Sequence, residues 1–251
     1  MTWTLKTSPV SSLPKYTTVF GVPVFAASST TDAQFQHAAS VLAEWLDNDE
    51  DGCVDNPTVL TKLTEKTDSV QASIVVPGKD GTMTEALRLS LEKAGYSTSA
   101  PLYNEELLPS CSGPAATSSC ADASLEEIWH VVTSAGYAKA FPTTFAVSST
   151  SNSVLTQAMD VARGGKFTNP TIPANGYKPT AWYTYNDATC NYECMATEYI
   201  YWGVCSWVGA LAGRETGEGA GNISKEWKFG TKAKLEKGDL KMTAIIKVLI
   251  Y

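Results

Sequence analysis

The chain has 251 residues and a formal net charge of −7 at pH 7, from 26 acidic and 19 basic residues. It has no run of basic side chains that could neutralise phosphates or anionic lipid headgroups, so nucleic acid is not an expected partner. No stretch reaches the roughly 18 uninterrupted apolar residues of a transmembrane helix, so we expect no membrane insertion. A chain of this length can bury a full core, and we predict a single domain over residues 1–251.

Six cysteines, an even number, indicate disulfide bonds. Cys111 and Cys120 bracket a short polar loop that closes easily as a ring, so we predict a disulfide between them. Cys190 and Cys194 are closely spaced, and they could bind a metal instead of forming disulfides. The cysteines outside the predicted bridge allow three pairings that the sequence does not separate: Cys53, Cys190, Cys194 and Cys205.

The cellular setting that these features favour is extracellular. Asn222-Ile223-Ser224 is an acceptable N-glycosylation sequon. Together with the cysteine count it indicates an oxidising compartment. The first residues lack the charged-then-apolar layout of a signal peptide. The even number of cysteines nevertheless favours a secreted, mature form whose leader has been removed.

The first part of the chain predicts an arm and a strand. Residues 1–17 are rich in Thr, Ser and Pro and indicate an arm. Residues 17–27 are rich in Val and Phe, which is typical of extended chain. Pro23 lies inside this run, so we predict an edge strand rather than a central one.

A helix follows, from Thr31 or Asp32 to about Leu46, because an N-capping residue precedes apolar residues at helical spacing. His37 lies beside the apolar stripe of this helix. It is a candidate metal ligand in reserve, which folding could bring to His130. The alternative is that His37 is satisfied at the boundary of the core.

An acidic loop comes directly after this helix and resembles an EF-hand calcium loop. Oxygen ligands at loop positions one, three and five, glycine at six and a carboxylate at nine fit that pattern. So many carboxylates would repel one another without a cation. The alternative is an acidic, solvated turn. The resemblance implies that Ca²⁺ is bound by Asp47, Asp49, Asp51, Cys53 and Asp55.

Asn56 and Pro57 then start a second helix that we expect to reach Lys66, which gives a helical hairpin over residues 32–67. The departure from the EF-hand is Thr58 at loop position twelve, where that motif has a bidentate glutamate. We therefore expect a weaker site, suited to the higher calcium concentration outside cells.

The next stretch indicates a small α/β element. Residues 69–76 are rich in β-formers and end at Pro77-Gly78, and Thr82 or Thr84 can cap a helix that Gly95 ends after Ala94. A short segment over residues 96–103 completes the α/β element, and residues 105–121 form the loop that follows.

A helix around the second histidine holds the strongest chemical signal. Apolar residues at helical spacing predict that it begins near Asp122 or Ser124, and Gly136 is expected to end it. Glu126 and His130 are four residues apart, and Glu127 and His130 are three apart, so all three share one side. Two carboxylates and an imidazole within one turn are typical of a metal site or a general acid/base.

The segment Glu126-Glu127-Ile128-Trp129-His130 resembles the His-Glu-x-x-His signature of the zincin metallopeptidases, over five residues. Where that family has its first histidine, this chain has Glu126. The resemblance implies that Glu126 and His130 bind a transition metal such as Zn²⁺ and that Glu127 is the catalytic general base. A solvated pair of glutamates beside a histidine is the alternative.

The second half predicts further helices. Residues 141–147, with Pro142, indicate a loop or an edge strand. Residues 151–163 and about 193–212 have apolar residues at helical spacing. The helix over about 193–212 is apolar on almost every side. Residues 240–249 fit either a helix or a strand.

Glu198 is the only carboxylate of the 193–212 helix after its first residue. A buried carboxylate costs several kcal/mol unless it is paired or bound to metal. Some zincins take a third ligand from a glutamate on a later helix, so the resemblance implies that Glu198 completes the transition-metal site. The alternative is a glutamate hydrogen-bonded by the neighbouring tyrosines.

The sequence therefore predicts a mainly helical α+β fold with a small β-sheet, in a zincin-like arrangement. The expected function is that of a secreted, metal-dependent hydrolase acting on a peptide or another small extracellular substrate, stabilised by calcium. The rival hypothesis is a non-enzymatic, calcium-binding extracellular binding or matrix protein.

Overall fold

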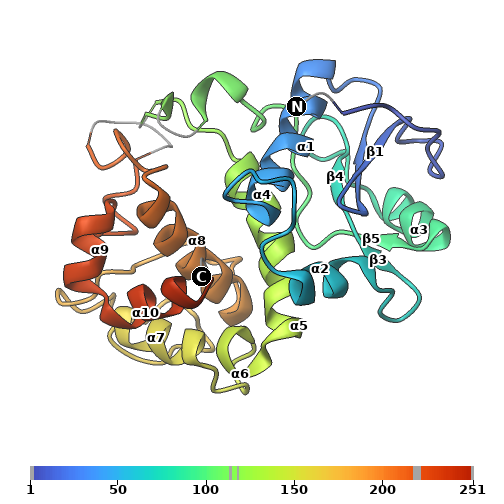
Figure 1. Cartoon of the computed structure of the whole chain (residues 1–251). Helices are drawn as coiled ribbons and strands as arrows, with labels where there is room; N and C mark the ends of the chain where they lie inside the picture. Colours follow the sequence, from blue (N-terminus) through green and yellow to red (C-terminus); the bar gives the residue numbers. More distant parts are fainter. Residues whose placement is uncertain (1–2, 113–114, 118, 217–221, 250–251) are drawn as a thin grey trace. The chain divides into compact units, whose positions relative to one another are not determined.

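The computed structural model describes residues 3–112, 115–117, 119–216 and 222–249 (Figure 1). Helices dominate it and the strands form only two small sheets, which confirms the predicted mainly helical α+β class. Its contacts divide the chain into two compact units, Met1–Pro109 with Asp122–Ala140, and Ser110–Ala121 with Phe141–Tyr251. The position of one unit relative to the other is not determined, so each is described by itself.

The first unit opens with a hairpin of β1 (Lys15–Val19) and β2 (Val22–Ala26), joined at Phe20 and Gly21. Both turn residues have positive φ, 48° and 88°, as a tight two-residue hairpin turn requires. A third strand, β4 (Ile74–Val76), pairs with β2 in parallel. The sheet order is therefore β1-β2-β4.

The predicted edge position of Pro23 is wrong, because β2 is the central strand. Pro23 pairs only with Thr18 of β1, and the ladder between β2 and β4 begins one residue later, at Val24. The backbone N–H that proline lacks is therefore not needed on the β4 side.

Two predicted helices follow in the same unit. Helix α1 (Asp32–Leu46) begins at Thr31, whose side chain accepts a hydrogen bond from the Gln34 backbone in a capping box. Helix α2 (Pro57–Thr64) begins at Asn56 and ends two residues before the predicted Lys66. The acidic loop joins α1 to α2.

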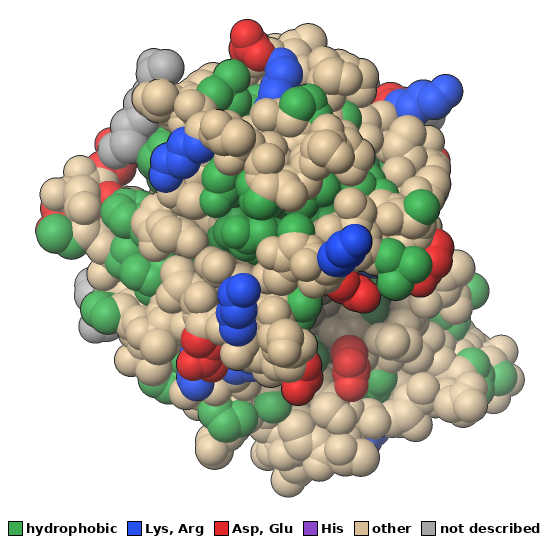
Figure 2. Space-filling view, turned by 90° about the vertical axis from the view of Figure 1, so that its right-hand side faces the viewer, with side chains coloured by type: hydrophobic (Ala, Val, Ile, Leu, Met, Phe, Trp, Pro, Cys, Tyr) green, Lys and Arg blue, Asp and Glu red, His purple; other side chains and the backbone are tan. Residues whose placement is uncertain are grey.

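The small α/β element is also present. A two-stranded parallel sheet pairs β3 (Gln71–Ala72) with β5 (Tyr96–Ser97). Between them, α3 (Glu85–Ala94) begins at Thr84 and ends at Gly95, which is left-handed as a C-cap. Figure 2 views the molecule from the side of α3 and shows hydrophobic side chains gathered near the middle of that face. The core beneath α3 consists of Val10, Leu13, Phe25, Val75 and Leu91.

The helix with the second histidine, α4 (Ser124–Val131), does not end at Gly136 as predicted. It continues as a π-helix, η3 (Val132–Tyr137), and then as α5 (Ala138–Ala140). A Cβ on Gly136 would lie 2.8 Å from a methyl carbon of Val59 in α2. This glycine therefore permits close packing of two helices and is not a stop signal.

The second unit is helical. The prediction of a loop or edge strand near Pro142 is wrong, because this proline occupies the first turn of a short helix, α6 (Pro142–Phe145), where its missing N–H costs nothing. The predicted 151–163 helix is confirmed as α7 (Val154–Ala162). The tail consists of α9 (Lys232–Gly238) and α10 (Leu240–Leu249), so its last segment is a helix.

Helix α8 (Tyr192–Val208) is the centre of this unit, and α7, α9 and α10 all pack against it. Nearly all of its residues are buried, as its apolar composition predicts. Gly203 allows α10 to pack closely against α8, because a Cβ there would lie 2.6 Å from Met242.

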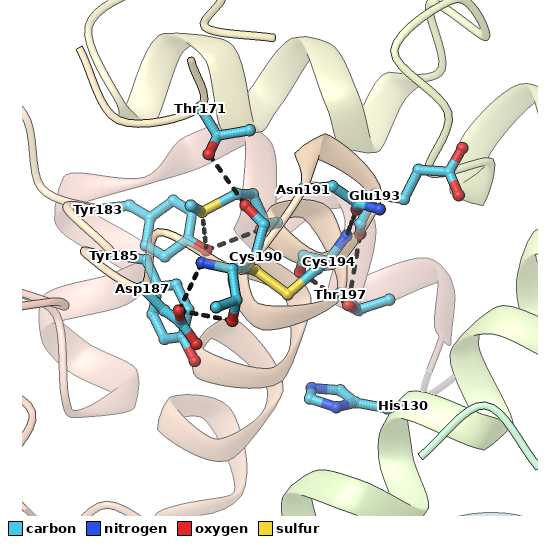
Figure 3. The surroundings of a disulfide bond; sticks show 12 residues. His130, Thr171, Tyr183, Tyr185, Asp187, Cys190, Asn191, Glu193, Cys194 and Thr197 are labelled. Atoms are coloured by element: carbon cyan, nitrogen blue, oxygen red, sulfur yellow. Dashed lines mark hydrogen bonds between the residues drawn. A yellow bond between two sulfur atoms is a disulfide. The ribbon is translucent and has the colours of Figure 1, made fainter. Parts of the chain in front are cut away.

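Two disulfides lie in this unit. The predicted bridge between Cys111 and Cys120 is present, as is a second between Cys190 and Cys194 at the start of α8 (Figure 3). The second bridge selects one of the pairings that the sequence left open. It also opposes metal binding by these two thiols.

Among the described residues, no helix has both the length and the apolar character that crossing a membrane would need.

Candidate functional site

The start of α4 is fixed by Asp122, two residues before the helix. Its Oδ1 accepts the backbone N–H of Ser124 at 3.2 Å and that of Leu108 at 3.0 Å. The residue directly before the helix, Ala123, offers no side-chain cap. Asp122 therefore acts as the N-cap of a helix that begins where the sequence predicted.

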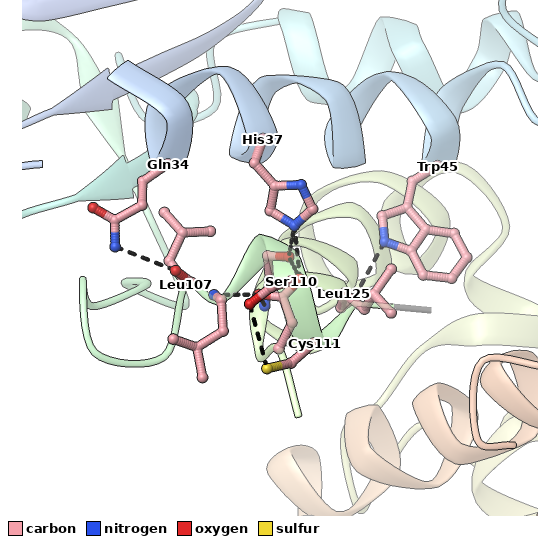
Figure 4. Close-up of polar contacts among 10 residues, drawn as sticks. Gln34, His37, Trp45, Leu107, Ser110, Cys111 and Leu125 are labelled. Atoms are coloured by element: carbon pink, nitrogen blue, oxygen red, sulfur yellow. Dashed lines mark hydrogen bonds and ion pairs between the residues drawn. The ribbon is translucent and has the colours of Figure 1, made fainter. Parts of the chain in front are cut away.

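His37 of α1 binds this same cap (Figure 4). Its Nε2 lies 2.7 Å from Asp122 Oδ2 and 3.2 Å from Ser124 Oγ, and Ser124 Oγ also donates to Asp122. A serine, a histidine and an aspartate meet here without forming a catalytic triad, because both partners use the same ring nitrogen. His37 thus anchors α4 to α1, which is its role as a boundary residue. Its role as a reserve ligand stays a prediction.

Trp45 makes a second link between α1 and α4. Its indole N–H donates to the Leu125 carbonyl oxygen at 3.2 Å, and its ring lies 4.6 Å from that of Trp129. Gln34, His37 and Trp45 point to the same side of α1 (Figure 4). Polar bonds and aromatic packing thereby hold α4 in place.

The predicted ligands of α4 converge as the helical spacing requires. A carboxylate oxygen of Glu126 and a ring nitrogen of His130 lie within 4.8 Å of one another. Glu127 Oε2 lies 3.7 Å from His130 Nδ1. The side chains of Glu127 and His130 are 25% and 12% exposed, so both are partly withdrawn from solvent. Oxygen and imidazole nitrogen at this separation suit one divalent ion.

The π-helix begins two residues after His130. Single π-helical turns inside α-helices occur frequently at functional sites. Thr133, in this turn, is fully buried, and its hydroxyl has no hydrogen-bond partner among the residues that the structure describes. Sequence reasoning missed this feature, because no residue pattern distinguishes a π-turn from the α-helix around it.

Further carboxylates surround Glu127 within the same unit. Burial raises the pKa of Glu106, and the charges of Glu127, Asp80 and Glu105 raise it further. Burial also raises the pKa of Tyr103, with these acidic groups adding to the effect. The electrostatic potential here is therefore negative and favours a cation. No pattern within α4 predicts this potential, because the added groups come from loops outside that helix.

Glu198 lies in α8 of the second unit and is only 4% exposed. Its charge adds to burial in raising the pKa of Tyr183 and of Glu226. The Tyr183 hydroxyl donates to the Met195 carbonyl oxygen at 2.8 Å. That proton is therefore not available to Glu198, which weakens the alternative of capping by this tyrosine.

Tyr199, a second neighbour in sequence, donates its hydroxyl to Asp239 at 2.6 Å. The hydroxyl proton of Tyr199 is therefore not available to Glu198 either. Glu198 belongs to the second unit, whereas Glu126 and His130 belong to the first. A metal site shared by these three residues therefore stays a prediction.

The acidic loop between α1 and α2 brings three of the predicted calcium ligands close together. Carboxylate oxygens of Asp47, Asp49 and Asp55 lie within 4.8 Å of one another. Asp47, 3% exposed, also accepts the backbone N–H groups of Asp51 and Gly52 at 3.1 and 3.0 Å. Gly52 has φ of 87°, which only glycine adopts easily, so the glycine at position six has its expected role.

Two of the predicted calcium ligands lie outside this group. The Asp51 carboxylate accepts the backbone N–H of Cys53 at 2.7 Å. Burial raises the pKa of Glu44 in the neighbouring helix, and the charges of Glu50 and Asp47 raise it further. Negative charge is therefore concentrated around the loop, as a cation site requires.

Asn222, the predicted glycosylation site, lies in the second unit. Its side-chain oxygen accepts the backbone N–H of Ser224 at 2.8 Å and the Ser224 hydroxyl at 2.6 Å. The sequon is therefore folded into a local turn, and its modification stays a prediction.

Comparison with known proteins gives no family for this chain. No family model matches it, and no curated protein or solved structure matches it either.

Proposed function

We propose that this protein is a secreted, metal-dependent hydrolase that resembles a metallopeptidase and is stabilised by calcium. The observation that carries the proposal is the convergence of a Glu126 oxygen and a His130 nitrogen within 4.8 Å. They lie on a helix that is anchored at its start by His37 and Asp122. An anchored pair of ligands is the preorganised arrangement that a catalytic metal needs.

The donor set suits zinc, because carboxylate oxygen and imidazole nitrogen are ordinary zinc ligands. Glu126 and His130 would bind the ion from α4, and the buried Glu198 of α8 would be the third ligand. When bound, zinc lowers the pKa of a coordinated water and polarises a carbonyl group. Glu127 accepts the proton of the attacking water. Its carboxylate lies 3.7 Å from His130, one of the proposed ligands, and is therefore close to the proposed metal.

The proposed substrate is a peptide or a similar small acyl compound outside the cell. The two disulfides support an oxidising environment for the mature protein. Calcium in the acidic loop, held by Asp47, Asp49 and Asp55, stabilises the α1–α2 hairpin on which α4 rests. This loop is the observation that favours the second hypothesis, a calcium-binding extracellular protein without catalysis.

Metal analysis separates the two hypotheses. The purified protein is dialysed against zinc and then against buffer, and zinc and calcium are measured per chain. We expect one zinc in the wild type and none in His130→Ala. A protein that retains only calcium would contradict the hydrolase and support the second hypothesis.

Variants of the glutamates extend this test. Glu198→Gln should lose most of its zinc, whereas Glu193→Gln, an exposed glutamate in the first turn of the same helix, should keep it. Glu127→Gln should keep zinc but lose hydrolysis of a mixture of fluorogenic peptides. Loss of a ligand removes the ion, whereas loss of the general base removes only the proton acceptor. Glu126 replaces an imidazole, so we expect weaker zinc binding than a two-histidine motif gives.

A further inference from the structure

Glu127 and His130 interact through one identified nitrogen of the imidazole. Glu127 Oε2 lies 3.7 Å from Nδ1 of His130, three residues further along α4. The other ring nitrogen, Nε2, is fully buried. The two nitrogens therefore differ in their position: the Glu127 carboxylate lies beside Nδ1, and Nε2 is closed off from solvent.

We infer that Glu127 is a positioning residue for His130, which holds the proton on Nδ1 and presents Nε2 to the metal. This inference rests on the proposed metal site and adds a role to the general-base function of Glu127. Histidine ligands of metals almost always donate their other ring N–H to a carboxylate, a carbonyl or water. That contact fixes the tautomer and the orientation of the ring, and it makes the metal-binding nitrogen more basic.

The local structure favours such a role. Both side chains are mostly buried, at 25% and 12% exposed, so water screens their attraction only partly. Asp122 and Trp45 fix the backbone of α4 within a turn or two of both residues. The separation of 3.7 Å is an ion-pair distance, and catalytic contacts of this kind commonly tighten when the site is loaded.

Neighbouring charges act in the same direction. The negative charges of Glu106 and Glu127 repel one another, and the charge of Glu127 raises the pKa of Glu106. A cation or an N–H donor beside Glu127 relieves that repulsion. Nδ1 of His130, 3.7 Å from Glu127 Oε2, is such a donor when it carries the proton.

The two roles of Glu127 can be separated by substitution. Glutamine keeps a side-chain oxygen that accepts the Nδ1–H bond, but it cannot take a proton from water. Alanine keeps neither property. Positioning therefore predicts that Glu127→Gln binds metal nearly as well as the wild type, whereas Glu127→Ala binds it more weakly.

The measurement is the zinc affinity of the full chain by chelator competition, with the absorption spectrum of bound cobalt(II) as a second readout. We expect Glu127→Ala to weaken zinc binding by roughly 10–100-fold, the usual effect of removing such a partner. Its cobalt spectrum should also change, because the imidazole is no longer held. Glu92→Ala, an exposed glutamate of α3 in the same unit, is the matched control and should bind like the wild type.

Equal zinc affinity in Glu127→Ala and the wild type would overturn the positioning role and leave the metal site standing. A wild type that binds neither zinc nor cobalt would overturn the proposed function and this inference with it. A second measurement needs no variant: ¹⁵N NMR of His130 in the zinc-loaded wild type should show the proton on Nδ1. Zinc bound through Nδ1 would contradict the inference even if Glu127→Ala did not fold.

Discussion

His37 Nε2 and Asp122 Oδ2 lie 2.7 Å apart, and this contact joins α1 to the start of α4 across 85 residues of sequence. The Asp122 side chain is completely buried, whereas that of His37 is 18% exposed. Asp122 caps the helix that carries Glu126 and His130. The geometry of the proposed metal site therefore depends on a residue that binds no metal.

Removing His37 should destabilise the first unit. In His37→Ala the buried Asp122 carboxylate loses one of its donors, so we expect the free energy of unfolding to fall by roughly 1–3 kcal/mol. Urea denaturation measures this loss. His37→Gln can still donate a hydrogen bond and should lose less. Equal stability of His37→Ala and the wild type would show that the contact contributes nothing.

The same contact predicts a dependence on pH. Burial alone would raise the pKa of Asp122, but hydrogen bonds from His37, Ser124 and the Leu108 backbone outweigh it and hold this pKa below its ordinary value of 3.8. A carboxyl whose pKa is lower in the folded state stabilises the protein fully above its unfolded pKa. That contribution is lost as pH falls through the folded pKa.

We therefore expect the stability difference between the wild type and Asp122→Asn to be constant from pH 6 to about pH 5 and to shrink below about pH 4. Urea denaturation at a series of pH values measures it. Taking the difference cancels the other acidic groups, such as Glu106, whose pKa is raised. A difference that grows as the pH falls would contradict the assigned sign.

Local signals predicted much of the fold. Thr31, Asn56 and Thr84, which are among the caps that the sequence predicts, each begin a helix, and Gly95 ends α3 in the left-handed conformation. The ligand spacing of Glu126 and His130 was also predictable, because it follows from helical geometry alone. Each of these features depends on residues within one or two turns of each other.

The errors come from packing between distant segments. Gly136 was expected to end a helix, but its role is to admit Val59 of α2. Pro23 was assigned to an edge strand, because the sequence does not show where β4 stops pairing with β2. The contact between His37 and Asp122 has no local signal at all, since it joins two segments that only the fold brings together.

The packing of Gly136 leads to a test by double substitution. Gly136→Ala places a Cβ 2.8 Å from Val59 Cγ1 and 3.3 Å from Leu63 Cγ. Overpacking of this kind costs about 1–3 kcal/mol, more than the gain of up to about 1 kcal/mol that alanine brings to a helix. We expect a lower midpoint of urea denaturation for Gly136→Ala.

Val59→Ala removes the atom that the new Cβ meets, but it leaves a cavity when made alone. The double variant should therefore be more stable than the sum of the two single losses predicts. Strict additivity would show that α2 and the π-helix do not meet at these residues.

The last prediction concerns calcium in the loop of Asp47, Asp49 and Asp55, whose oxygens lie within 4.8 Å of one another. Because a cation bound only by the folded chain stabilises it, calcium at about 100 times its dissociation constant contributes about 2.7 kcal/mol. For a protein of this size that corresponds to a rise in Tm of roughly 5–10 °C. Scanning calorimetry with calcium and with a chelator measures the shift.

Asp49→Ala should abolish most of this shift, because it removes one ligand and leaves the rest of the loop in place. Glu236→Ala, an exposed acidic residue of α9, is the matched control for loss of one negative charge and should keep the response to calcium. Identical unfolding curves with chelator and with excess calcium would identify the loop as an acidic turn. Zinc binding by His130 should survive Asp49→Ala at temperatures where the chain is folded, since the two proposed sites have no ligand in common.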